Sequence, residues 1–138
     1  MGAWYTIGLC LGLGLGVGII LAGLLGSTTL GASAAALIAT AGGALVGVLI
    51  GDIAETIAGG VGGFFGAVSA AAVLYGALRR GATRFGVAAY LGMAGVLVCL
   101  LALIPLVGYA QAVGVPLLAA RMRGRQAARF AGLRTLAK

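Results

Sequence analysis

Apolar residues gather in long runs along this chain, and short polar segments separate one run from the next. Three of these runs cover residues 4–26, 32–51 and 57–78, and none of the three contains a charged residue. A helix needs ~20 predominantly apolar residues to cross the hydrocarbon core of a bilayer. An isolated strand cannot cross it, because its backbone groups would have no hydrogen-bond partners in lipid. Each run therefore predicts one membrane-spanning helix.

The last apolar run, residues 86–120, is too long for a single crossing. As one helix it would measure about 52 Å at ~1.5 Å per residue, against ~30 Å for the hydrocarbon core. Pro105 lies where a turn is needed, since proline disrupts a helix interior and restricts the residue before it. We predict a fourth span over 85–103 and a fifth over 106–120. The fifth is short, and a re-entrant hairpin is the alternative.

The composition agrees with a protein that lies in a membrane. Hydrophobic residues make up 62% of the 138 residues and charged residues only 8%, whereas soluble domains carry roughly 25% charged residues. So few charges cannot cover the water-facing surface of a globule of this size, which excludes a soluble domain. We predict an all-α fold, a polytopic transmembrane helical bundle of about five spans over residues 1–120.

The basic residues fall into two clusters, and each cluster flanks a long apolar run. One cluster lies at residues 79–84 and the other at residues 121–138. Lysine and arginine accumulate in the cytoplasmic segments of membrane proteins, and two crossings between the clusters keep both on one side. The pattern predicts a multi-pass protein of the plasma membrane, with its N-terminus outside and its C-terminus in the cytoplasm. Because the basic residues are confined to these two clusters, the pattern argues against a nucleic-acid partner, although the net charge is +7.

Residues 121–138 have the pattern of a basic amphipathic helix. Arg121, Arg125 and Arg129 form a stripe with a spacing of four residues, beside an arc of apolar side chains. Such a helix next to a membrane span suits a leaflet with anionic headgroups, at about 1 kcal/mol per basic residue near the surface. We predict a cytoplasmic tail whose arginines face lipid headgroups. Binding of an acidic protein partner is the alternative.

Glycine is unusually frequent, with 27 residues against a usual share of ~7%. Many of these glycines recur every four residues and so share one face of a helix. Faces without side chains let helix backbones approach closely, which matters in lipid because no hydrophobic gain favours a helix partner over a lipid tail. The spacing predicts glycine-zipper packing at Gly8, Gly12, Gly16, Gly43, Gly47, Gly51, Gly59 and Gly63. These grooves either pack the helices of one chain or join copies into a homo-oligomer, because the first run has small residues on at least two faces.

Candidate chemistry is sparse. The chain has no histidine, and Asp52 and Glu55 are its only acids. The residues needed for catalysis with an imidazole base, or for zinc binding at clustered ligands, are therefore missing. We expect no catalytic residue, no metal and no cofactor. The two acids follow a complete span, which predicts a solvated turn at the outer membrane interface. Alternatively they form a cation or proton site, with Gln111 as a further polar group.

From these patterns we expect a non-enzymatic, glycine-packed membrane protein with a structural or assembly role. The alternative is a small channel or transporter that uses Asp52 and Glu55 for a cation or a proton. The sequence points to no particular small-molecule ligand.

Overall fold

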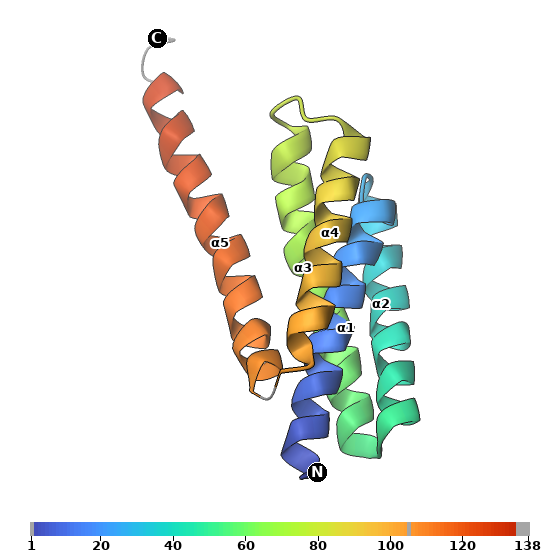
Figure 1. Ribbon diagram of the computed structural model, residues 1–138. Coiled ribbons are helices and arrows are strands. Elements are labelled where there is room, and N and C mark those ends of the chain that lie inside the picture. The colour runs from blue at the N-terminus through green and yellow to red at the C-terminus, as the bar shows by residue number, and fades with distance from the viewer. Residues whose placement is uncertain (1, 105, 135–138) are drawn as a thin grey trace.

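The chain folds into five helices in a computed structural model that describes residues 2–104 and 106–134, with side chains up to Met122. In chain order they are α1 (Ala3–Leu25), α2 (Thr29–Ile50), α3 (Ile53–Leu78), α4 (Arg84–Ala102) and α5 (Val107–Arg134) (Figure 1). The first four are each long and apolar enough to span a membrane. The prediction of an all-helical fold is therefore confirmed for the described residues, with four helices suited by length and composition to cross a membrane. α5 is not among those four, and a fifth span stays a prediction.

The first helix lies at the centre of the bundle. α1 packs against each of the other four helices, and its largest contact is with α3. The apolar stretches of α1 and α3 are 56% and 61% buried, against 22% for α2 and for α4. Large apolar side chains such as Leu37 on α2 and Leu97 on α4 are exposed on the outside. An apolar outer surface of this kind suits lipid as the surrounding solvent.

The helices begin earlier than the apolar pattern predicts at two places. α2 starts at Thr29, inside the segment expected to be a turn, because the Thr28 hydroxyl accepts a hydrogen bond from the Gly31 nitrogen at 3.0 Å. A threonine at this position satisfies one of the free N–H groups at a helix start. α3 likewise starts at Ile53, within the polar segment at 52–56. The polar residues there cap the helix instead of forming a loop.

The break predicted at residues 104–105 is confirmed by the end of α4 at Ala102 and the start of α5 at Val107. Leu106 has a left-handed backbone with a φ of 71°, which reverses the chain direction. The Tyr5 hydroxyl donates a hydrogen bond to the Leu103 carbonyl oxygen at 3.1 Å and holds the end of α4 to α1. Pro105 itself lies outside the described residues.

The fifth helix is continuous through the boundary expected at residue 120. α5 runs from Val107 to Arg134, so residues 121–134 extend the helix that begins before them and are not a separate element. Pro116 lies inside α5, and proline is tolerated within membrane helices when the freed carbonyl group finds other partners. Arg121 is exposed, while the side chains of Arg125 and Arg129 lie outside the described residues.

Acidic and basic residues lie at opposite ends of the bundle. The N-terminus and the α2–α3 connection lie together at one end, called here the acidic end because it holds Asp52 (Figure 1). The α1–α2 and α3–α4 connections lie at the other, called here the basic end, where Arg84 donates a hydrogen bond to the Ser27 hydroxyl. α5 runs back from the α4–α5 connection in the direction of the basic end.

Candidate functional site

The two acids have different surroundings, although they lie three residues apart. Asp52 is exposed and precedes α3, whereas Glu55 is in the first turn of α3 and is only 6% exposed. Glu55 Oε2 accepts a hydrogen bond from the Asp52 nitrogen at 3.1 Å, which is half of a capping box. The prediction of a solvated turn is therefore wrong for Glu55. The sequence signal that could have found this arrangement is the acid-x-x-Glu spacing at a helix start.

The second carboxylate oxygen of Glu55 connects α3 to α1. The Thr6 hydroxyl oxygen lies 2.6 Å from Glu55 Oε1 and 2.9 Å from the Ala3 carbonyl oxygen. Because a hydroxyl has one proton, Thr6 can donate to only one of these two acceptors at a time. The Glu55 side chain fits beside α2 because Gly51 has no Cβ; one built there would lie 2.7 Å from Glu55 Cδ.

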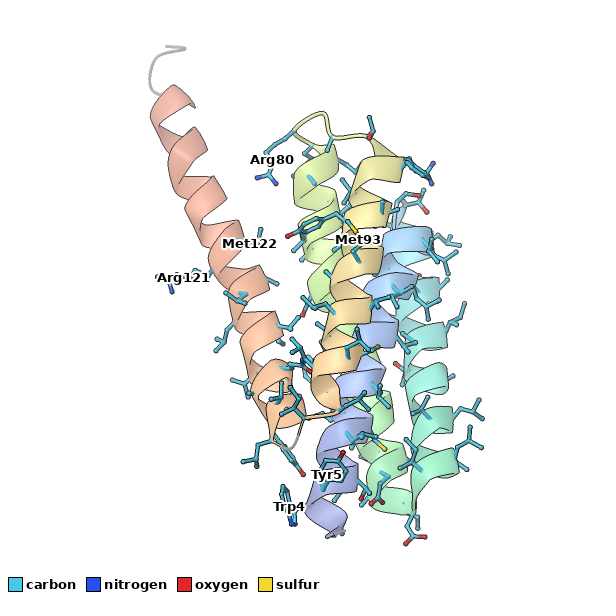
Figure 2. All side chains as sticks on the ribbon, viewed as in Figure 1. Trp4, Tyr5, Arg80, Met93, Arg121 and Met122 are labelled. Carbon is cyan, nitrogen blue, oxygen red and sulfur yellow. The ribbon has the colours of Figure 1, made fainter. Side chains whose placement is uncertain are left out.

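Aromatic residues fasten α1 to the α4–α5 region at the same end of the bundle. The Tyr109 hydroxyl donates to the Trp4 carbonyl oxygen at 2.6 Å, and the Tyr109 ring lies over Gly8. Trp4 is 54% exposed, and its ring is nearly perpendicular to that of Tyr5, at 80° (Figure 2). Tryptophan and tyrosine favour membrane interfaces. The role of Tyr109 is not visible in the sequence, because nothing in the pattern pairs it with Gly8.

Gln111, the third predicted polar candidate, does not join the acids. Its Nε2 atom donates to the Val98 carbonyl oxygen at 3.2 Å, which connects α5 to α4. Its Oε1 atom is buried beside Gly12 and has no hydrogen-bond partner. No hydrogen bond among the described side chains links Gln111 to Asp52 or Glu55. The three candidates therefore do not form one site.

Each of the eight predicted packing glycines faces a neighbouring segment of the same chain. Gly8, Gly12 and Gly16 face α4 and α5, where a Cβ would collide with Tyr109, Ala102 and Cys99 respectively. Gly43 and Gly59 face each other, Gly47 and Gly51 face Glu55, and Gly63 faces Ala39. The two faces of small residues on α1 are thus both covered within one chain.

Three helix backbones meet at one point in the bundle. A Cβ on Gly14 of α1, or on Gly43 of α2, would lie closer than 3.0 Å to the carbonyl oxygen of Gly59 on α3. Real Cβ atoms essentially never approach another atom that closely. Only glycine permits this contact, and any larger residue must push two helices apart.

A crevice runs along α3 where α5 diverges from the bundle. The α5 crevice has two adjoining hollows of about 180 and 330 Å³, which share Ser69 and Ala119. The smaller hollow lies between α3, α4 and α5, and the larger lies between α3 and α5. α3 and α4 make only a small contact with each other, which leaves the space open. Tyr90 contributes a hydroxyl group to the described lining. The remaining described lining side chains are apolar: Ile19, Phe65, Val68, Ala70, Ala72, Val73, Leu91, Ala94, Val98, Val115, Pro116, Leu118, Ala120 and Met122.

The described part of the chain offers no ligand cluster for a metal ion, since no three Cys, Asp or Glu side chains gather there.

Comparison with protein-family models, with curated proteins and with solved structures finds no match for this chain.

Proposed function

We propose that this chain is a multi-pass protein of the plasma membrane with a non-enzymatic, structural or assembly role. The observation that carries the proposal is the position of Glu55, the buried one of its two acids. Both carboxylate oxygens accept hydrogen bonds from within the chain, one from Thr6 and one from the Asp52 backbone. A carboxylate engaged in this way stabilises the start of α3 and fastens it to α1, which is a structural task.

The glycine contacts support the same proposal. Where Gly14, Gly43 and Gly59 bring three backbones together, no room is left for a water-filled path between α1, α2 and α3. Close backbone contact of this kind is how helices associate in lipid without a hydrophobic driving force. We infer glycine-zipper packing within one chain. Association of several copies would have to use exposed outer faces of the bundle, such as those of α2 and α4, because the predicted grooves are filled.

The second candidate function is a small channel or transporter for a cation or a proton, and it rests on the burial of Glu55 beside Thr6. The test is flux of protons, sodium and potassium into liposomes that hold the purified protein. We expect no flux above that of protein-free liposomes. Flux that is lost in Glu55→Gln but kept in Asp52→Asn, the exposed neighbour, would replace the structural proposal with the transport one.

The orientation is proposed from the positions of the charges. α5 runs back toward the end that carries Arg79, Arg80 and Arg84, so its residues 121–134, the described part of the second basic cluster, extend toward the same side (Figure 1). By the positive-inside rule this side is the cytoplasm, and anionic headgroups there are the proposed lipid partners of the basic residues. Cysteines placed at residues 52, 80 and 123 test this. A membrane-impermeant thiol reagent should label only Asp52→Cys in intact cells, and labelling of residues 80 and 123 from opposite sides would overturn it.

A further inference from the structure

The α5 crevice is wide because α5 is fastened to the bundle mainly near its start. Gly108 lies directly against the Gly8 backbone, and the Tyr109 hydroxyl bonds to the Trp4 carbonyl. Beyond this attachment α5 leans away from α3 and α4 as it approaches the basic end (Figure 1). The crevice therefore opens toward the basic end and closes toward the α4–α5 connection.

The chemistry of the crevice selects an apolar occupant. Among the side chains that the structure describes, only Ser69, which is 6% exposed, and the Tyr90 hydroxyl line it with polar groups, and the rest are aliphatic or aromatic. Water in a cavity needs 2–4 polar partners, roughly, and two hydroxyl groups cannot keep hollows of this size filled with ordered water. The occupant must therefore present hydrocarbon to the walls.

The shape of the crevice favours a thin occupant, because it is divided into two hollows that adjoin at Ser69 and Ala119. A flexible acyl chain is thin enough to lie along both hollows past Ser69.

The open end of the crevice carries an unopposed positive charge. Arg80 is exposed at the end of α3, and its side chain lies on the side of α3 that faces α5 (Figure 2). Asp52 and Glu55, the only acids of the chain, lie at the opposite end of the bundle, so no carboxylate competes for this guanidinium. Guanidinium groups bind phosphate oxygens through charge-assisted hydrogen bonds. Arg121, on α5, points away from the crevice.

We propose that the α5 crevice binds one anionic phospholipid, with an acyl chain between α3, α4 and α5 and its phosphate at Arg80. The apolar walls provide the affinity for the chain, and the charge at the opening provides the preference for an anionic headgroup. This proposal rests on the placement of the chain in a membrane, and it is independent of whether the protein transports an ion.

Native mass spectrometry of the detergent-solubilised protein tests the proposal with two lipids of identical acyl chains, phosphatidylglycerol and phosphatidylcholine. We expect one bound phosphatidylglycerol per chain and weaker retention of phosphatidylcholine. Arg80→Gln should reduce the preference for phosphatidylglycerol about fivefold, which corresponds to about 1 kcal/mol per basic residue near a headgroup. Arg121→Gln is the matched control and should leave the preference unchanged.

A second variant tests the apolar part of the site. Ser69→Leu fills the point that both hollows share, and we expect it to abolish the adduct of either lipid. Ala89→Leu is the control, because it adds similar bulk to the exposed outer face of α4, and we expect it to leave both adducts in place. Circular dichroism checks that each variant keeps its helical content. Equal retention of the two lipids by the parent protein, or an unchanged preference in Arg80→Gln, would overturn the proposal. A protein dimer in place of the lipid adduct would also overturn it.

Discussion

Replacing Gly14 by alanine tests the close approach of α1 to α3. A Cβ on residue 14 would lie no more than 3.0 Å from the Gly59 carbonyl group and from the Gly63 nitrogen. These are backbone atoms inside α3, so they cannot rotate aside as a flexible side chain can. α1 and α3 must separate by about 1 Å to admit the methyl group, and overpacking of this kind costs about 1–3 kcal/mol.

Gly92→Ala is the matched control for this substitution. Gly92 also lies inside a helix, α4, but no atom lies within 4 Å of a Cβ built at that position. Both changes gain helix propensity, about 1 kcal/mol for alanine over glycine, and this gain cancels when the two variants are compared. The difference in stability between them therefore isolates the cost of packing a methyl group between α1 and α3.

The measurement is the free energy of unfolding in mixed micelles, from titration with a denaturing detergent and circular dichroism as the signal. We expect Gly14→Ala to be less stable than Gly92→Ala by about 2 kcal/mol. Equal stabilities of the two variants would refute the reasoning, because they would mean that α1 and α3 are farther apart at residue 14 than the structure describes.

Two further predictions concern the acidic end. Glu55→Ala should lower the free energy of unfolding by about 1–3 kcal/mol, because it leaves the Asp52 nitrogen without an acceptor and removes the hydrogen bond between Thr6 on α1 and α3. Asp52→Ala should cost less, since Asp52 is exposed. Equal losses in the same unfolding assay would contradict the assigned role of Glu55. Tyr109→Phe should weaken the attachment of α5 by about 1 kcal/mol through loss of its bond to the Trp4 carbonyl. Hydrogen exchange of α5 should then be faster than in Tyr90→Phe, a variant of an exposed tyrosine, and identical exchange in the two would argue against that attachment.

The membrane-spanning helices could be predicted from the sequence because the thickness of a bilayer fixes their length. The spans expected over 4–26 and 85–103 match α1 and α4 to within one residue at each end. The continuity of α5 could not be predicted in the same way. The boundary was expected at residue 121 because the side chains change there from apolar to basic, and bilayer thickness does not decide whether the helix continues. Backbone hydrogen bonds of a helix do not depend on whether its side chains are apolar or basic, so Val107–Arg134 forms one helix across that change.

The partners of the glycines and the burial of Glu55 lay beyond the sequence pattern. A spacing of four residues shows that Gly8, Gly12 and Gly16 share a face, but it does not say which helix covers that face. Small residues on two faces of α1 left open whether those faces pack within one chain or against a second copy. The structure provides several neighbours within one chain, since α1 is central. Glu55 was misplaced for a different reason, because a polar segment between two apolar runs has the same composition whether it is a loop or a capped helix start.

The central position of α1 has a consequence for biogenesis. α1 precedes every helix that surrounds it, so during synthesis it enters the bilayer before any of its neighbours exist. Its contact face around Gly14 and Gly18 can be covered only once α3 has followed it. Until then the nascent chain holds a helix whose contact face for α3 is covered at most in part, by α2. A membrane chaperone or protease should therefore be able to distinguish ribosome-bound chains that stop after α2 from the finished fold.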